Sequence, residues 1–124
     1  MATILVVDDE AHMRRLVSYI LESAGHRVLA APEGQTALAY LDDESQSIDL
    51  VFADIAMPGM DGFELLGTIR SHDRWRHLPV VVLTAQGQDR DLNRALSTGA
   101  DDFITKPFSS SQLLAAVRSL VPGA

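Results

Sequence analysis

Carboxylates follow two short apolar runs of this sequence. Asp8 and Asp9 follow the run 4–7, and Asp54 follows the run 50–53. Apolar runs of this length are typical of strands buried on both faces. Because ligands bind at the carboxyl ends of strands in an open parallel sheet, the three carboxylates are expected at one edge of such a sheet. Taken alone, Asp54 has the alternative role of capping the turn that follows, since Asp is common in turns.

Three carboxylates at one sheet edge favour a divalent cation between them. Like charges at short range cannot all ionise without a counter-charge. The sequence has no cysteine, and its four histidines show no paired spacing. Oxygen ligands without sulfur or imidazole select Mg²⁺ or Mn²⁺ rather than zinc. We therefore expect Asp8 and Asp9 to hold Mg²⁺ (or Mn²⁺) near Asp54; the alternative is that the pair forms a solvated turn.

Lysine occurs once in the sequence, as Lys106, where the run 102–105 meets Pro107. A lysine ammonium can pair with a carboxylate or with a phosphoryl oxygen as a point charge. Together with a metal ion, this charge nearly neutralises the three carboxylates, so that a phosphoryl group becomes acceptable beside them. A solvated loop lysine is the simpler alternative.

Thr84 follows the run 79–83, and the small Ala85 leaves space beside it. A hydroxyl at this edge can donate to a phosphoryl oxygen, although β-propensity alone would also explain a threonine. Together these groups describe phosphoryl transfer, in which a protein mainly positions groups and neutralises oxygens. Asp54 stands apart from the proposed metal pair, so it is the expected nucleophile and would form an aspartyl-phosphate.

The elements that position these residues alternate regularly along the chain. The expected strands are residues 4–7, 27–31, 50–54, 79–83 and 102–105. Helices are expected at about 33–43 and 88–97, and where apolar stripes occur at 13–24, 61–69 and 113–121. Gly25 should end the first helix, and Asp61 should be the N-cap of the third. Five strand–helix alternations predict an α/β fold with a parallel sheet and helices on both faces, joined by right-handed crossovers. The helix 88–97 is the weakest amphipath, which makes it a candidate mobile element.

Length and composition limit the classes of function. At 124 residues, the chain is expected to be a single domain, 1–124, with no output domain. A net charge of −7 argues against a nucleic-acid surface, which needs clustered Lys and Arg. The N-terminus lacks a basic region and meets Asp8 at once, so neither a signal peptide nor a membrane span is expected. We expect a cytoplasmic protein that binds neither nucleic acid nor membranes.

Taken together, the candidate site residues resemble those of one protein family. The pair Asp8-Asp9, the stretch Asp54 to Gly62 with its Met57-Pro58-Gly59-Met60-Asp61-Gly62 turn, Thr84-Ala85 and Lys106-Pro107 are similar to the response-regulator receiver domain of two-component signalling, over essentially the whole chain. The resemblance implies a flavodoxin-like (βα)5 three-layer sandwich with a five-stranded parallel sheet of order 2-1-3-4-5. It also implies that Asp54 accepts a phosphoryl group from the phosphohistidine of a histidine kinase or a histidine phosphotransfer protein. Such a domain is not a turnover enzyme, since it catalyses only its own phosphorylation and autodephosphorylation.

The resemblance assigns further roles residue by residue. Asp8 or Asp9, Asp54 and the backbone carbonyl of Ala56 would bind Mg²⁺, and Lys106 would contact the phosphoryl group, with a cis bond to Pro107. Thr84, Ala85 and Phe103 would transmit phosphorylation to the surface made by the fourth helix, the fifth strand and the last helix. That surface would bind a downstream effector protein or a second copy of the chain. Phe at position 103, where the family often has Tyr, lacks the hydroxyl, so core packing is its alternative role.

Three rival functions remain at this point. A haloacid-dehalogenase-type phosphatase also forms an aspartyl-phosphate, but it carries its acidic residues in an Asp-x-Asp arrangement and not as an adjacent pair. A flavodoxin would need a hydroxyl-rich phosphate loop where Asp8 and Asp9 stand. A pure interaction module could keep the fold without phosphorylation, although the presence of Asp54, Thr84 and Lys106 argues against it.

Overall fold

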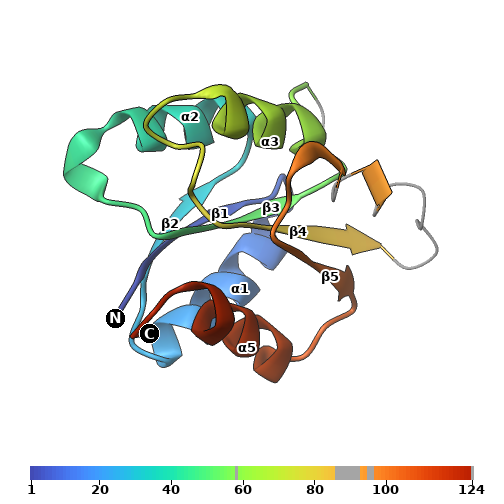
Figure 1. The fold of residues 1–124 in the computed structure, drawn as a ribbon. Coiled ribbons are helices and arrows are strands. Elements are labelled where there is room, and N and C mark those ends of the chain that lie inside the picture. The colour runs from blue at the N-terminus through green and yellow to red at the C-terminus, as the bar shows by residue number, and fades with distance from the viewer. Residues whose placement is uncertain (58, 86–92, 95–96, 124) are drawn as a thin grey trace.

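Five parallel strands form one sheet in this computed structural model, which describes residues 1–57, 59–85, 93–94 and 97–123. The strands are β1 (Thr3–Val7), β2 (Arg27–Ala31), β3 (Leu50–Asp54), β4 (Val80–Ala85) and β5 (Asp102–Lys106). Their order is β2-β1-β3-β4-β5, so that β1 and β3 lie side by side near the centre (Figure 1). The expected order and the flavodoxin-like fold are both confirmed.

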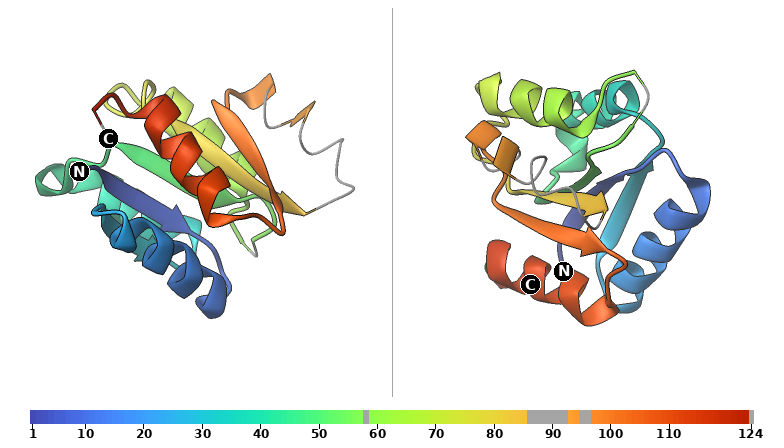
Figure 2. Two further views of the ribbon diagram at one scale, coloured as in Figure 1. Left: turned by 90° about the horizontal axis from the view of Figure 1, so that it is seen from below. Right: turned by 90° about the vertical axis from the view of Figure 1, so that its right-hand side faces the viewer.

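Helices cover both faces of the sheet, which gives three layers. They are α1 (Ala11–Ser23), α2 (Gly34–Asp42), α3 (Gly62–Ser71) and α5 (Ser110–Leu120), with a 3-10 turn η1 (Glu44–Gln46) after α2. Helices α2 and α3 lie on one face, and α1 and α5 on the other (Figures 1 and 2). Of the expected helix 88–97, residues 88–92 and 95–96 lie outside the described part of the chain, while residues 93, 94 and 97 are helical, as is residue 98. No helix in the described ranges is long and apolar enough to cross a membrane.

The continuous apolar runs of the sequence arise because each central strand feeds two cores. In β1, Leu5 and Val7 pack with α2 and α3, whereas Ile4 and Val6 pack with α1 and α5. Phe52 of β3 is likewise fully buried on the α1–α5 side. Side chains alternate across a strand, so a strand covered on both faces must be apolar at every position. Because the central strands are packed on both faces, their carboxyl ends, which carry the candidate site, are held in position.

Two strands continue one or two residues past the carboxyl ends of their apolar runs, 79–83 and 102–105. β4 continues to Ala85 and β5 to Lys106, because the two strands remain paired, with Thr84 opposite Thr105 and Ala85 opposite Lys106. Apolar patterning cannot detect these polar ends, since their backbone pairing depends on the neighbouring strand. The extended pairing brings Lys106 to the same edge as Asp54, which lies opposite Leu83 in the register of β3 and β4.

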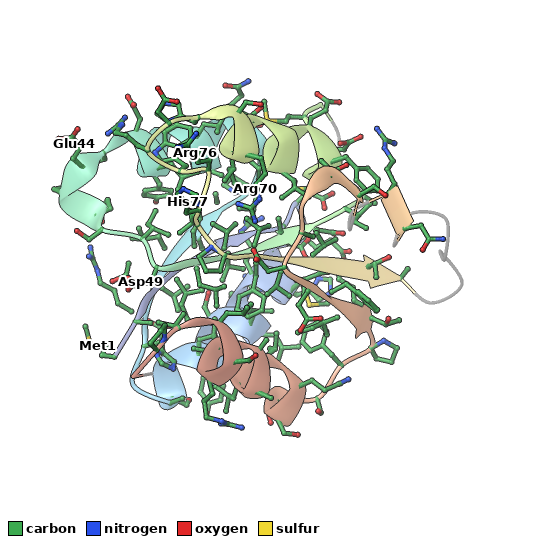
Figure 3. All side chains as sticks on the ribbon, viewed as in Figure 1. Met1, Glu44, Asp49, Arg70, Arg76 and His77 are labelled. Carbon is green, nitrogen blue, oxygen red and sulfur yellow. The ribbon has the colours of Figure 1, made fainter. Side chains whose placement is uncertain are left out.

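Arg70 fixes the opposite end of β5, near the middle of the view in Figure 3. This α3 side chain donates to the carbonyls of Leu78 (2.6 Å) and Gly99 (2.8 Å) and to Asp101 Oδ2 (2.7 Å). The same Asp101 oxygen accepts from the backbone N–H of Val80 at 2.8 Å. One guanidinium therefore joins α3, the start of β4 and the turn into β5, because its planar fork can serve several acceptors at once.

Candidate functional site

Asp54, the last residue of β3, has a buried carboxylate with a partner on each oxygen. Oδ1 accepts from the backbone N–H of Ala56 at 3.1 Å, and Oδ2 lies 3.1 Å from Lys106 Nζ. The residue is 6% exposed, so these two contacts set the orientation of the group. A turn from Asp54 to Ala56 also exists, as the capping alternative requires, but it uses only one of the two oxygens.

Asp8 follows β1 and is completely buried at the same edge. Its Oδ1 accepts from the N–H of Glu10 at 3.0 Å, and its Oδ2 lies 3.2 Å from Lys106 Nζ. Arg14 of α1 donates to the backbone carbonyl of Asp8 at 2.8 Å. The single lysine therefore bridges two carboxylates from neighbouring strands, so Lys106 is not a solvated loop residue.

The electrostatics of this trio follow from burial and short distances. Burial raises the pKa of Asp54, an effect that Lys106 and the N–H of Ala56 oppose and that Asp8 increases. Burial alone would lower the pKa of Lys106, but attraction to Asp54 and Asp8 outweighs it and raises the pKa. The ammonium is therefore retained, and two carboxylates share one positive charge. Such a site retains attraction for a further cation.

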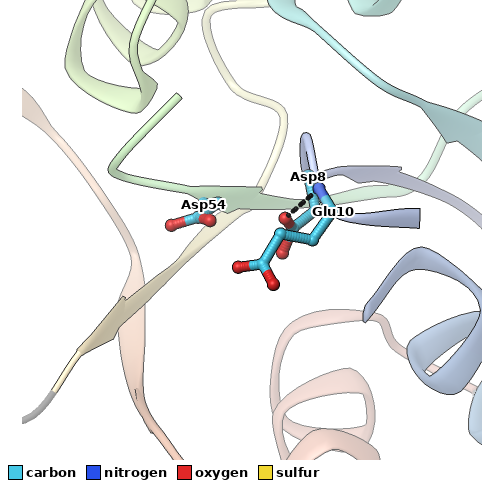
Figure 4. Close-up of side chains that lie close together, drawn as sticks. All are labelled: Asp8, Glu10 and Asp54. Carbon is cyan, nitrogen blue, oxygen red and sulfur yellow. Dashed lines mark hydrogen bonds between the residues drawn. The ribbon is translucent and has the colours of Figure 1, made fainter. Parts of the chain in front are cut away.

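A third carboxylate, that of Glu10, completes a group suited to a metal ion. Oxygen atoms of Asp8, Glu10 and Asp54 lie within 4.8 Å of one another (Figure 4). All these donors are hard oxygens, and two of the residues are buried, so the set fits Mg²⁺ or Mn²⁺. The sequence predicts Asp8 and Asp9 as the residues that hold the metal. Asp9, however, is exposed and lies outside this group, whereas Glu10 lies within it. The turn closed by Asp8 Oδ1 and the Glu10 N–H brings Glu10 back toward the strand end.

The remaining predicted site residues lie on β4 and β5. Thr84 is buried at 1% exposure, Ala85 after it is exposed, and Phe103 is 37% exposed on β5. The Lys106–Pro107 peptide bond is cis, as the resemblance implies. Thr84 and Ala85 thus share the sheet edge with Lys106, while Phe103 lies three residues earlier along β5.

Gly62 is a residue of the site that side-chain chemistry alone does not reveal. Its N–H donates to the carbonyl of Ile55 at 2.9 Å, which folds the first turn of α3 back onto the end of β3. A Cβ at this position would collide with the carbonyl oxygen of Asp54 and would lie 2.8 Å from Ile55 Cα. Only glycine allows so close a backbone approach. The dipeptide Asp61-Gly62 carries the signal in the sequence, and Asp61 caps α3 by accepting from the Glu64 N–H at 2.9 Å, as predicted.

Comparison with known proteins identifies the family. The family profile of the response regulator receiver domain matches residues 4–118. The chain belongs to this family. The receiver domain is 38% identical to the phosphate regulon transcriptional regulatory protein PhoB of Escherichia coli K12, over 95% of this chain and 51% of that protein. It is 41% identical to the regulatory protein VanRc of Enterococcus gallinarum, over 94% of this chain and 48% of the relative. The chain therefore spans about half the length of these curated relatives.

Solved structures agree with this assignment. The chemotaxis protein CheY4 of Vibrio cholerae superposes with a TM-score of 0.88 at 30% identity, covering 98% of this chain and 99% of that one. The receiver domain of NtrX from Brucella abortus gives a TM-score of 0.88 at 36% identity, with 98% and 99% coverage. As a receiver domain, this chain is a phosphoacceptor signalling module of two-component systems and not a classical enzyme.

Lys106→Gln is expected to strengthen Mg²⁺ binding to the receiver domain by about fivefold, because the ammonium competes with the metal for Asp8 and Asp54 in a partly desolvated site. Calorimetric titration with MgCl₂ measures the change. Arg118→Gln is the matched control, since it removes one positive charge from an exposed position of α5. Equal affinities for the two variants would show that Lys106 acts only through the net charge of the chain.

Proposed function

We propose that Asp54 is the phosphorylated residue of this receiver domain and that it works in a phosphorelay. The observation that carries this proposal is the fixed Asp54 carboxylate, held by the Ala56 N–H on one oxygen and facing Lys106 with the other. A carboxylate so oriented needs little reorganisation to attack phosphorus. The ammonium of Lys106 would neutralise an oxygen of the incoming phosphoryl group.

The proposed donor is the phosphohistidine of a histidine kinase or a histidine phosphotransfer protein. An Asp54 carboxylate oxygen attacks phosphorus, and the new O–P bond forms as the P–N bond breaks. The electron pair remains on the donor nitrogen, which leaves as neutral imidazole when its other nitrogen carries a proton. The product is an acyl phosphate on Asp54. Attack of water on its phosphorus would return the carboxylate and release inorganic phosphate, which is the autodephosphorylation that the chain would catalyse.

Mg²⁺ (or Mn²⁺) would be held by Asp8, Asp9 and Asp54 together with the backbone carbonyl of Ala56. When bound, the ion supplies positive charge beside the phosphoryl oxygens. The grouping of Asp8, Glu10 and Asp54 supports a cation site and makes Glu10 a further candidate ligand. The protein's own part is to hold these oxygens at one sheet edge and to keep Lys106 beside them.

Phosphorylation is proposed to act on partners through Thr84, Ala85, Lys106 and Phe103. Thr84 and Ala85 pair with Thr105 and Lys106 of β5, so a change of charge at Asp54 reaches β5 through adjoining backbone. The responsive surface would comprise the fourth helix, β5 and α5. Capture of a charged group at one strand end can bias such a surface between two arrangements.

The partner of that surface would be a downstream effector protein. Because the chain spans about half the length of PhoB and VanRc, the effector could equally be a further domain of a longer regulator. Pairing of two phosphorylated copies is a further proposed output. With a net charge of −7, this chain is not expected to bind nucleic acid or anionic membranes itself, and we propose that it acts in the cytoplasm.

Phosphoramidate, a small donor with a P–N bond, tests the proposed function without a kinase. We expect intact-mass measurement to show one phosphoryl group per chain in MgCl₂ and almost none in EDTA. The label should be lost in hydroxylamine, which cleaves acyl phosphates. Equal labelling in MgCl₂ and in EDTA, or a label that remains after hydroxylamine treatment, would contradict the proposal.

Substitution of single carboxylates tests the ligand set. Asp8→Asn is expected to weaken Mg²⁺ binding at least about tenfold, because its carboxylate is fully buried and already oriented, whereas Glu10→Gln should cost only about threefold. The Glu10 side chain is half exposed and lies 3.3 Å from His12 Nε2. Calorimetry on these two variants and on Asp9→Asn ranks the three residues. A loss in Asp9→Asn no greater than in Glu10→Gln would remove Asp9 from the proposed ligands.

A further inference from the structure

A groove lies at the end of the sheet opposite the acidic group. It encloses about 260 Å³ between η1, the segment that leads into β3 and the segment that leads into β4. Tyr40, Ile48, Trp75 and Leu78 form its apolar walls, and the charged residues Asp43, Glu44 and Arg74 also line it. Figure 3 shows Glu44 at this end of the molecule, away from the tips of the strands. The sequence leaves open whether Trp75 is a docking contact or only covers its own loop.

The Trp75 ring, which forms one wall of this groove, is held in place by its neighbours before any ligand binds. Trp75 stacks on His72 with ring centroids 3.6 Å apart and planes 12° apart. The Arg74 guanidinium carbon lies 5.7 Å from the centre of the Trp75 ring. Arg74 in turn binds Asp42 at 2.7 Å and Glu44 at 2.9 Å. A ring fixed from two sides loses little conformational freedom on binding, which favours affinity.

The rim of the groove is acidic. The rim is made by the exposed residues Asp43 and Glu44, which line the groove, and by the exposed Asp42, which precedes them. Arg74 pairs with Asp42 and Glu44, so the three carboxylates exceed this cation in charge. Hydrogen bonds from the side chains of Ser45 and Gln46 and from the Ser45 N–H lower the pKa of Asp43, so this carboxylate stays charged at neutral pH. An apolar hollow with an excess of negative charge at its mouth complements an apolar side chain next to a basic one.

We propose that this groove docks a segment of a partner protein that carries a large apolar side chain beside Lys or Arg. The volume of about 260 Å³ is below the roughly 300–1,000 Å³ of typical small-molecule sites, so it suits one anchoring side chain rather than a cofactor. Tryptophan and tyrosine are enriched at such anchor points in protein interfaces. The basic neighbour would pair with Asp43 and Glu44, which line the groove and are exposed.

This docking site is independent of the proposed phosphorylation. The groove lies where β3 and β4 begin, whereas Asp8, Asp54 and Lys106 lie where β1, β3 and β5 end. A partner bound at the groove would leave the edge that carries Asp8, Asp54 and Lys106 accessible to a phosphoryl donor. Docking could therefore proceed with or without a phosphoryl group on Asp54.

Tetrapeptide amides with blocked N-termini test the proposal. The probe is Ala-Leu-Arg-Ala, and the controls are Ala-Leu-Glu-Ala and Ala-Gly-Arg-Ala. Trp75 is the only tryptophan of the chain, so its emission and its indole N–H signal in ¹⁵N spectra report on the groove directly. We expect saturable shifts confined to residues 40–48 and 72–78, with about fivefold weaker binding for each control peptide.

Two variants separate groove binding from general attraction to an acidic protein. Asp43→Asn with Glu44→Gln removes two negative charges from the groove while Asp42 still pairs with Arg74, and it should weaken binding of the Arg-containing peptide about fivefold. Ile48→Lys should abolish binding. Leu16→Lys, on the exposed face of α1, is the matched control and should bind normally. Shifts centred on α1, equal binding of the acidic peptide, or no saturation below about 10 mM would overturn the proposal.

Discussion

Asp54→Asn is expected to abolish incorporation of a phosphoryl group from phosphoramidate. The amide has almost the same shape, and its oxygen can still accept from the Ala56 N–H, so the fold should be retained. An amide cannot act as the nucleophile, because it lacks the anionic oxygen that attacks phosphorus. The loss should therefore be complete in intact-mass spectra, while circular dichroism and the urea midpoint remain close to those of the native chain.

Asp101→Asn is the matched control for this substitution. It also replaces an aspartate with its amide, but Asp101 binds Arg70 and Val80 at the opposite end of the sheet. We expect this variant to be labelled to the same final stoichiometry as the native chain. Residual labelling of Asp54→Asn would place the acceptor on another residue, and loss of labelling in both variants would point to a general structural effect.

Gly62→Ala is expected to be the most disruptive single methyl addition near the site. The new Cβ would collide with the carbonyl oxygen of Asp54 and would lie 2.8 Å from Ile55 Cα, both of which are backbone atoms that cannot rotate away. Overpacking of this kind typically costs about 1–3 kcal/mol of unfolding free energy. The displaced Asp54 backbone should also slow phosphorylation. Urea denaturation and the initial rate of labelling measure the two effects.

Gly67→Ala, five residues further along α3, is expected to have the opposite effect on stability. A Cβ at this position meets no atom within 4 Å. Alanine is favoured over glycine inside a helix by about 1 kcal/mol, so this variant should be slightly more stable than the native chain and should be labelled normally. Similar losses of stability in both variants would show that the close approach of Gly62 to β3 does not control the site.

Much of the fold follows from the sequence because double burial has a simple pattern. The apolar runs at 4–7 and 50–53 are continuous, since both faces of the central strands are covered by helices. The sequence also marks helix ends correctly at Gly25, whose φ is +93°, and at Asp61, which caps α3. Strand order could be predicted only from the family resemblance, because the periodicity of a sequence does not show which strands are neighbours in the sheet.

The candidate site was less completely predictable. The lysine bridge between Asp8 and Asp54 depends on the adjacency of β1 and β3 and on the extension of β5 to Lys106, which are long-range features. The grouping of Glu10 depends on a local turn that the acidic run Asp8-Asp9-Glu10 does not by itself define. The need for Gly62 arises from a backbone contact across eight residues. In each case the missing information is how the backbone is arranged in three dimensions.

Borohydride reduction of the labelled protein shows directly whether Asp54, among the carboxylates at this edge of the sheet, carries the phosphoryl group. Borohydride converts an aspartyl-phosphate to homoserine and leaves free carboxylates intact, so peptide mass spectrometry identifies the modified position. We expect homoserine at position 54, formed only after treatment with phosphoramidate and Mg²⁺. An unmodified position 54 in fully labelled protein, or homoserine at another aspartate, would contradict the proposed role of Asp54.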